Sequence, residues 1–497
     1  MRRLFASLLV GAALLAPAAA RGETPSERRA ACKFGPGAPA HETLGVSRRE
    51  LRKLPIDYVI VVTQENRSFD HYFGKLAEYG QPDAEGWPEG WSNPDGDGVR
   101  VPPHHLASTC LEHGPPHQWG AMHKAWEQGA MTGFVKNAAV SAKTALKQQA
   151  KDRKHGKHRK RTPSDGHYSM GYYDGSDIPF YYWLSTQYAI SDRQFSSVMA
   201  GTWPNRAFMY TGSSGGVKDT IGPSGANARA FKLPQTRSIF HEMSLRWVPW
   251  GVFTDGSPRQ DVLGWGKPHA GVRNFATFLR QLKSGTLPRV SFVDPGSKDP
   301  ITQTNLHQDE HPPHNVQDGE AFARTIYEAA VASPLWPRMA LIYTYDEGGA
   351  MFDHVPPPTA CAATPPEAEV TQLGFRVPLI VVSPYARRHY VSHEPREHTA
   401  ILRLIEALYD LPALTARDAN SDALLDLFDF SSPQPTPANP PAAGVNGCAA
   451  GGSDLPDEDY EDEEDEDEAP DEADNAEVGG AGSPAGGLPT RGLDDAP

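Results

Sequence analysis

The chain of 497 residues has a formal net charge of −15, and most of that charge lies at one end. Residues 451–497 contain eighteen acidic residues and one arginine, so the rest of the chain is close to neutral. A near-neutral body lacks the basic surface typical of nucleic-acid binding, so we expect no nucleic-acid partner.

Residues 1–20 are predicted to be a signal peptide. Arg2 and Arg3 form a basic start, residues 4–15 are apolar, and three alanines at 18–20 provide a small-residue cleavage site. The string RRLF resembles part of a twin-arginine signal. We therefore expect a secreted or periplasmic protein. Since no later segment is long and apolar enough to span a bilayer, we expect no transmembrane segment in the mature chain.

An irregular N-terminal arm is predicted for residues 21–54, which are polar and rich in Arg, Gly and Pro. The chain has four cysteines, which are far apart and show no CxxC spacing: Cys32, Cys110, Cys361 and Cys448. This argues against a zinc site and fits an exported protein with one or two disulfide bonds. Four cysteines allow three pairings, and the sequence does not choose between them.

A buried strand is predicted at residues 56–62 (IDYVIVV), because a short apolar and β-branched run is bounded by polar residues. Glu65 and Asn66 follow it. In open α/β sheets, ligands collect at the carboxyl ends of strands, so this pair could form half of a cation site. It could equally cap the helix that follows.

A strongly basic segment at residues 143–161 has no apolar periodicity, and we expect it to form a mobile surface loop. It could steer anionic headgroups towards the protein. Alternatively, it is a solvated insertion that meets the acidic tail. Near the other end of the chain, the Pro-rich residues 431–443 predict a stiff linker, and the acidic remainder to residue 497 predicts a disordered tail.

Thr202 lies two positions before Pro204 in the string GTWPNR. Proline is favoured at the first helical position, so Thr202 is predicted to lie just before a helix N-terminus. Backbone N–H groups there favour an anion such as phosphate. The alternative is that Thr202 is only a capping hydroxyl.

Further strands and helices alternate along the chain. Strands are predicted at 289–295, 340–346 and 377–384, and amphipathic helices at 319–333 and 398–412. This alternation predicts an α/β fold with a mostly parallel central sheet flanked by helices on both faces.

Two further polar clusters could take part in chemistry. The string DEHPPHN at 309–315 offers His311 and His314 as imidazole donors, although solvated histidines are the alternative. Asp346 and Glu347 follow a predicted strand end and precede two glycines, which could also be an ordinary turn. Two acidic pairs at strand ends suit a hard or borderline divalent metal ion such as Mg²⁺, Ca²⁺ or Mn²⁺.

The strings ENRSFDHYFG, GTWPNR with the segment from 170 that precedes it, DEHPP, YDEGGAMFDHVPPP and REHTAILRLIE occur in this order. Together they resemble the phosphoesterase family, which includes bacterial phosphatidylcholine-hydrolysing phospholipases C, plant non-specific phospholipases C and a group of acid phosphatases. The resemblance covers residues 55–430, which it identifies as the catalytic domain. The basic segment at 143–161 and Ala350, where a third glycine is common, depart from the family pattern.

The resemblance implies an alkaline-phosphatase-like core with a divalent metal ion at one end of the sheet. The matched metal ligands are Glu65, Asn66, Asp346 and Glu347, and Thr202 matches a nucleophile that also touches the metal. His117, in the segment 115–134, and His311 match histidines that contact phosphate.

The function implied is that of a secreted phospholipase C that cuts the glycerol–phosphate bond of a phospholipid such as phosphatidylcholine. Peripheral contact with a membrane would accompany such a substrate. An acid phosphatase, acting on phosphate monoesters through the same site, is the first alternative. A non-catalytic exported binding protein is the second, but the presence of all four matched ligands and of Thr202 argues against it.

Overall fold

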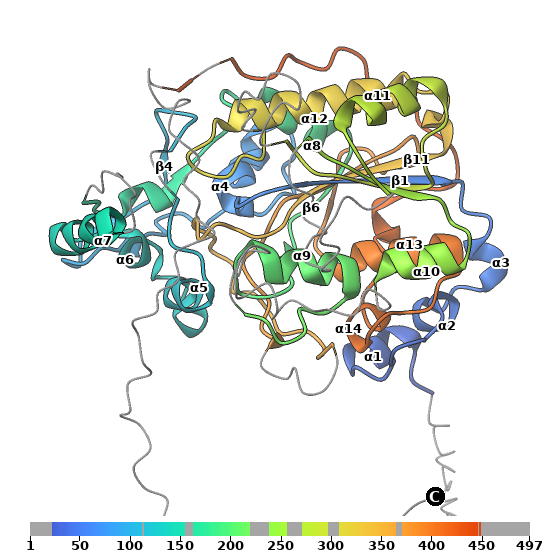
Figure 1. Ribbon diagram of the computed structural model, residues 1–497, viewed down its shortest axis with the longest axis horizontal. Coiled ribbons are helices and arrows are strands. Elements are labelled where there is room, and N and C mark those ends of the chain that lie inside the picture. Colours follow the sequence, from blue (N-terminus) through green and yellow to red (C-terminus); the bar gives the residue numbers. More distant parts are fainter. Residues whose placement is uncertain are drawn as a thin grey trace, which may run out of the picture. The chain divides into compact units, whose positions relative to one another are not determined.

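An eight-stranded sheet lies at the centre of the fold, in the order β13-β6-β12-β11-β1-β10-β8-β9 (Figure 1). The computed structural model describes residues 22–111, 114–154, 163–218, 238–255, 271–296, 308–363, 370–445 and 447–448. The strands of the sheet are β1 (Tyr58–Gln64), β6 (Ala189–Ser191), β8 (Trp250–Phe253), β9 (Val272–Arg273), β10 (Val290–Val293), β11 (Met339–Tyr345), β12 (Leu379–Val382) and β13 (Tyr390–Ser392).

Most neighbouring strands of this sheet are parallel. β1 pairs in parallel with both β10 and β11, and β8 pairs in parallel with β9 and β10. Only β12 is reversed relative to its neighbours, β11 and β6. The predicted strands correspond to β1, β10, β11 and β12, all of which are buried along nearly their whole length.

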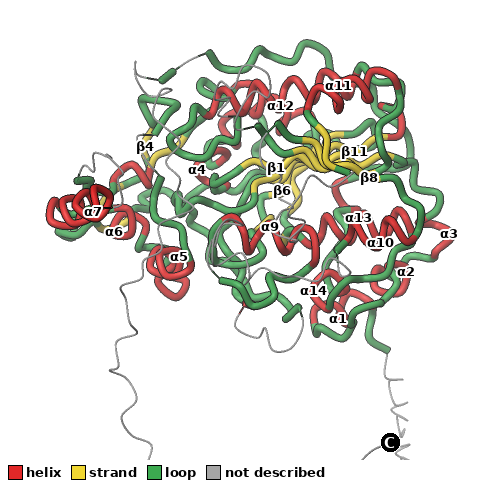
Figure 2. Tube along the Cα trace, in the orientation of Figure 1, coloured by secondary structure: helices red, strands yellow, loops and turns green. Residues whose placement is uncertain are grey.

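Helices cover both faces of the sheet, which confirms the predicted α/β fold class. Figure 2 shows the strands between two sets of helices. One set contains α8 (Pro179–Gln187), α11 (Phe275–Ser284) and α12 (Val316–Val331), and the other α9 (Thr202–Thr211), α10 (Ile239–Leu245) and α13 (Thr399–Tyr409). The two predicted amphipathic helices correspond to α12 and α13.

The remaining elements are short or lie outside the sheet. The helices are α1 (Pro25–Ala30), α2 (Ala40–Leu44), α3 (Arg48–Leu51), α4 (Phe69–Phe73), α5 (Trp119–Trp126), α6 (Phe134–Ala138), α7 (Ala142–Lys154) and α14 (Ala416–Ala419). Two-residue strands form three small pairs, β2 (Asn93–Pro94) with β3 (Arg100–Val101), β4 (His104–His105) with β5 (Gly171–Tyr172), and β7 (Gln194–Phe195) with β14 (Arg396–Glu397).

The N-terminal arm is more ordered than predicted, since it contains α1, α2 and α3. Capping boxes start two of these helices. Thr24 and Glu27 exchange hydrogen bonds at the start of α1, and Ser47 and Glu50 do so at the start of α3. Such boxes satisfy the first N–H groups of a helix, so short helices form here without an apolar face.

The prediction of a loop at 143–161 is wrong for its first part, because α7 runs to Lys154. Its Ala, Lys and Gln residues have high intrinsic helix propensity, which does not depend on apolar periodicity. The rest of the basic segment, the predicted signal peptide and the acidic tail lie outside the described residues.

Two disulfide bonds select one of the three possible pairings: Cys32 with Cys361, and Cys110 with Cys448. The first fastens the N-terminal helices to the body, and the second fastens the end of the Pro-rich segment. In the described part of the chain, none of the helices combines the length and the hydropathy needed to cross a membrane.

Candidate active site

Two acid-containing pairs leave the sheet side by side, at the carboxyl ends of β1 and β11. Gln64 and Tyr345, the last residues of these parallel strands, are partners in register. Glu65–Asn66 and Asp346–Glu347 therefore leave the same edge of the sheet, as predicted for a cation site. The Asn66 N–H donates to Asp346 Oδ1 at 3.3 Å, and all four side chains are buried.

The turn after the second pair brings the chain back against the first. Gly349 has a φ of 62°, and a Cβ at this position would lie 2.4 Å from the Asn66 carbonyl oxygen. Only glycine allows this close approach without strain. The Gly349 N–H donates to Glu347 Oε2 at 2.6 Å, which fixes the orientation of that carboxylate.

Arg206 joins the two pairs from the opposite side. Its guanidinium lies 3.0 Å from Asp346 Oδ2 and 3.5 Å from Glu65 Oε1, and also 2.7 Å from Asp294 Oδ1 at the end of β10. Arg206 was not predicted as a site residue, although its spacing of four residues from Thr202 could have indicated a role. Arg206 thus neutralises part of the charge of three buried carboxylates.

Thr202 is the first residue of α9, with Gly201 as the N-cap. It was predicted just before the helix, with Pro204 as the first helical residue, but Pro204 is the third residue of α9. Residues four apart lie on the same side of a helix, so Thr202 shares a side of α9 with Arg206. Arg206 contacts Glu65 and Asp346, so the side of α9 that carries Thr202 faces the two acid-containing pairs.

The residues fit a bound divalent cation, because two oxygens in the cluster have no partner. Glu347 Oε1 and Asn66 Oδ1 are buried, and neither has a hydrogen bond from any residue that the structure describes. Burial, followed by the charge of Asp346, raises the pKa of Glu347 well above its usual value. An oxygen-rich cluster of this kind suits a hard cation, which would satisfy both atoms.

His117 lies against this cluster. Its Nε2 is 3.2 Å from Asn66 Nδ2 and 4.0 Å from Glu347 Oε1, and its Nδ1 donates to the Pro115 carbonyl at 2.9 Å. Burial, and then the nearby His311, lower the pKa of His117 to about 4. The ring is therefore neutral at pH 7, with the lone pair on Nε2.

His311 packs edge-on against His117, with 5.6 Å between the ring centroids. Its Nδ1 donates to the Pro312 carbonyl at 2.6 Å, and burial lowers its pKa to about 4. The two predicted histidines therefore lie next to each other. In the same loop, His314 pairs with Asp309 at 2.5 Å, and the Asp309 carbonyl accepts the Glu65 N–H at 3.0 Å.

His398, at the start of α13, was also missed by the sequence analysis. Its Nε2 donates to the Asp346 carbonyl at 2.7 Å, and burial lowers its pKa, so the ring is a neutral donor. This bond fixes the backbone at the end of β11. The sequence feature that could have indicated this role is the position of His398 just before an amphipathic helix.

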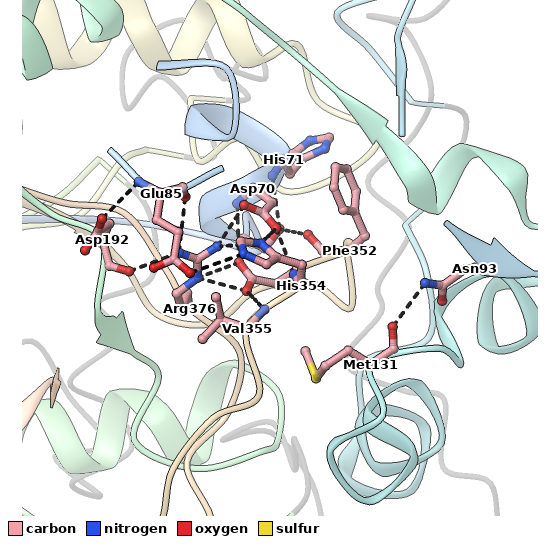
Figure 3. A network of polar contacts seen from close by, with 12 residues as sticks. Asp70, His71, Glu85, Asn93, Met131, Asp192, Phe352, His354, Val355 and Arg376 are labelled. Carbon is pink, nitrogen blue, oxygen red and sulfur yellow. Dashed lines mark hydrogen bonds and ion pairs between the residues drawn. The ribbon is translucent and has the colours of Figure 1, made fainter. Parts of the chain in front are cut away.

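A second acidic cluster consists of Asp70 in α4 and of Asp353 and His354 in the loop after β11 (Figure 3). It already holds a cationic group, because Arg376 lies 2.7 Å from Asp70 and 2.9 Å from Asp353. His354 Nδ1 is 2.6 Å from Asp70. We call these four residues the Arg376 network. It connects the helix that follows Glu65–Asn66 with the loop that follows Asp346–Glu347.

Solved structures match about half of the chain. A protein of the alkaline phosphatase superfamily from Vibrio parahaemolyticus is 13% identical and covers 50% of this chain and 64% of its own, with a TM-score of 0.33. The phosphonate monoester hydrolase of Agrobacterium radiobacter is 11% identical in sequence and covers 48% of this chain and 70% of its own, with a TM-score of 0.28.

Relatives in sequence match more of the chain. Phospholipase C B of Mycobacterium tuberculosis is 28% identical, over 78% of this chain and 80% of its own length. Non-specific phospholipase C3 of Arabidopsis thaliana is 26% identical, over 76% of this chain and 75% of its own length. Residues 56–412 match the family model of the phosphoesterase family. The chain belongs to the phosphoesterase family and is a phosphoric ester hydrolase.

Proposed function

We propose that the protein is a phospholipase C that hydrolyses the glycerol–phosphate bond of phospholipids of the phosphatidylcholine type, with Thr202 as the nucleophile. The observation that carries this proposal is the meeting of Glu65–Asn66 with Asp346–Glu347, where two buried oxygens accept no hydrogen bond from the described residues. The relatives named phospholipase C support the choice of substrate class.

Glu65, Asn66, Asp346 and Glu347 would hold the cation, and Thr202 would reach it from the start of α9. When bound, a divalent ion lowers the pKa of a hydroxyl and polarises a phosphoryl oxygen. The first N–H groups of α9 favour a phosphate group at this position, because they have no partner within the helix.

The reaction begins with attack of Thr202 Oγ1 on phosphorus. A bond forms from Oγ1 to phosphorus, and the bond from phosphorus to the glycerol oxygen breaks. Oγ1 loses its proton in this step, and the glycerol oxygen takes up a proton and leaves as diacylglycerol. The phosphocholine group remains on Thr202 until water attacks phosphorus. The bond from Oγ1 to phosphorus then breaks, one proton of the water passes to Oγ1, and phosphocholine leaves with the oxygen of the water.

His117 and His311 would contact the phosphate oxygens and the leaving group. Both rings are neutral at pH 7 and carry their Nδ1 proton towards a carbonyl. A ring that donates from Nε2 must therefore first take up a proton. The negative charge of a bound phosphate favours this uptake, since it stabilises the imidazolium.

Export is part of the proposal. The predicted signal sequence at 1–20 and two disulfide bonds support it, because such bonds persist in oxidising compartments. Sequencing the N-terminus of protein recovered outside the cytoplasm tests export directly. A mature chain that begins near residue 21 is expected, and a chain retained with Met1 in the cytoplasm would contradict it.

A substrate panel with and without a chelator tests the activity. We expect rapid release of phosphocholine from phosphatidylcholine, loss of activity with the chelator and recovery when Mg²⁺, Ca²⁺ or Mn²⁺ is added back. Faster hydrolysis of a simple phosphate monoester than of the diester would favour the acid phosphatase instead. Full activity in the chelated protein would contradict the metal-dependent mechanism.

A further inference from the structure

Glu310 is a fully buried carboxylate that accepts four hydrogen bonds from side chains. Oε1 accepts from Gln64 Nε2 at 2.8 Å and from the Tyr181 hydroxyl at 2.6 Å. Oε2 accepts from the hydroxyls of Tyr72 at 2.7 Å and Tyr345 at 2.6 Å. Four donors match the four lone-pair positions of an ionised carboxylate, so the group is fully satisfied.

Two of these donors come directly before the predicted metal ligands. Gln64 precedes Glu65, Tyr345 precedes Asp346, and Gln64 and Tyr345 are partners in register across β1 and β11. Successive side chains of a strand point to opposite faces. Glu310 therefore holds the two strand ends together from one face, while Arg206 contacts Glu65 and Asp346 from the other.

The backbone of Glu310 is fixed as firmly as its side chain. Its carbonyl accepts hydrogen bonds from Arg67 Nε at 2.8 Å and from Arg67 Nη2. A Cβ on Gly319 of α12 would lie 2.1 Å from Glu310 Cγ, so the helix fits closely against the side chain. Glu310 also has a φ of 67°, in a region that is unfavourable for a non-glycine residue and persists only where the surroundings determine it.

The residue after Glu310 is His311, which packs against His117. The position of the His311 ring over the candidate site therefore depends on the same anchor. Glu310 thereby connects three parts of the site: the end of β1, the end of β11 and the histidine loop.

We propose that Glu310 is a positioning residue, which sets the geometry of the two ligand pairs and of His311 through the hydrogen bonds that it accepts. It touches neither the substrate nor the cation. This inference rests on the proposed function, because it assigns Glu310 a purpose in that site. Groups that orient metal ligands typically change metal affinity or activity about 10- to 100-fold when they are replaced.

The test compares Glu310→Gln with Glu320→Gln in the full chain. Glu320, in α12, is also fully buried and accepts N–H groups from Phe180 at 2.7 Å, Tyr181 at 3.1 Å and Gly444 at 2.6 Å. It bonds to none of the predicted ligands or histidines. Both substitutions keep the side-chain volume and replace a carboxyl oxygen that accepts hydrogen bonds with an amide NH2 group. Both should lower the melting temperature.

The affinity of each variant for Mn²⁺ is then measured at a temperature where both variants are folded. At the same temperature, kcat for phosphatidylcholine is measured at saturating Mn²⁺. We expect Glu310→Gln to weaken Mn²⁺ binding and to lower kcat about 10- to 100-fold, and Glu320→Gln to leave both nearly unchanged. Equal effects of the two variants on all measurements would overturn the inference, since Glu310 would then be only structural. If Glu310→Gln does not fold, Tyr345→Phe removes one of the four donors and should lower kcat to a smaller extent, whereas an unchanged kcat would overturn the inference.

Thr202→Ala and chelated wild-type protein complete the series. If either retains full activity, the proposed function fails. If both are inactive while Glu310→Gln behaves like Glu320→Gln, only the positioning role fails.

Discussion

At the scale of single residues, Thr202 and Arg206 lie four positions apart at the start of α9. Arg206 neutralises carboxylates at the ends of three strands, and the same side of α9 carries Thr202 at the buried helix start. Thr202 was predicted from its place before Pro204, whereas Arg206 was not, because the partners of an arginine are set by strands far away in the sequence. Glu310 was missed for the same reason, since its four donors come from four separate segments.

Substitution of Thr202 tests its predicted role. We expect Thr202→Ala to lower kcat by a factor of about 10³ or more, because the substitution removes the attacking oxygen. Thr202→Ser keeps a hydroxyl and should retain much more activity. Release of phosphocholine is the measurement, and circular dichroism serves as a check of folding. A fully active Thr202→Ala protein would rule out the assignment.

Arg206→Gln should destabilise the metal-free protein by about 3–5 kcal/mol, because it leaves buried carboxylates without their cationic partner. Added Mn²⁺ should restore part of the loss, since it would neutralise the same groups. Chemical denaturation with and without Mn²⁺ measures both effects. The matched control is Arg338→Gln, which removes a half-exposed arginine from its pair with Asp57 and should change the free energy of unfolding by less than about 1 kcal/mol. A loss for Arg206→Gln no greater than that of the control would contradict this account.

At the scale of elements, the ends of β1 and β11 form the candidate site, and the Arg376 network joins α4, which follows β1, to the loop that follows β11. These strands and α12 and α13 were predictable because each has a strong local pattern, an apolar run or an amphipathic face. The helices α1, α3 and α7 were not, because capping and propensity form them without such a pattern. Since the cluster of Asp70, Asp353 and His354 holds Arg376, we propose that it has a structural role.

The pair of Asp70 and His354 in the Arg376 network should contribute stability that is lost both at low and at high pH. Burial raises the pKa of Asp70, but Arg376 and His354 outweigh it, so its pKa is lowered. Burial lowers the pKa of His354, but Asp70 outweighs it, so its pKa is raised. The stability that Asp70 contributes is fully present above its pKa in the unfolded chain, about 3.9. It is lost as pH falls through the lower pKa that Asp70 has in the folded protein. The stability that His354 contributes is fully present below its pKa in the unfolded chain, about 6.5. It is lost as pH rises through the higher pKa that His354 has in the folded protein.

The free energy of unfolding of His354→Gln, compared with that of the wild type, tests this dependence. The difference should be largest near pH 5 and shrink as pH rises above about 6.5. In an Asp70→Asn background, the effect of His354→Gln on the free energy of unfolding should vary much less with pH, because the partner carboxylate is gone. A difference that stays constant from pH 5 to pH 9 would contradict the role of the pair.

At the scale of the whole molecule, the two disulfide bonds fasten segments near both ends of the described chain to the body. Cys32–Cys361 spans 329 residues and holds the arm with α1 to α3. The order of strands in the sheet and the choice of pairing could not be read from the sequence, because both depend on contacts between distant segments. The set of polar residues at strand ends was readable, because parallel strands bring such residues to one edge.

Replacing both Cys32 and Cys361 by serine should lower the free energy of unfolding by about 2–5 kcal/mol, because the unfolded chain loses a long-range constraint. The activity of the folded protein should change little, since the N-terminal arm contributes no predicted site residue. Denaturation of the variant and of the wild type, followed by assays of both at low temperature, gives the two values. Equal stability of the two proteins would show that the bond adds no constraint.

The central claim is that a cation held by Glu65, Asn66, Asp346 and Glu347 prepares Thr202 for attack on phosphorus. Anomalous diffraction from crystals of the Mn²⁺-loaded protein tests it most directly. The account predicts an anomalous peak among these four side chains, with Thr202 Oγ1 at about 2.0–2.5 Å from the ion, the range of hard-cation–oxygen bonds. A peak at Asp70, Asp353 and His354 instead, or Thr202 remote from the ion in an active crystal, would contradict it.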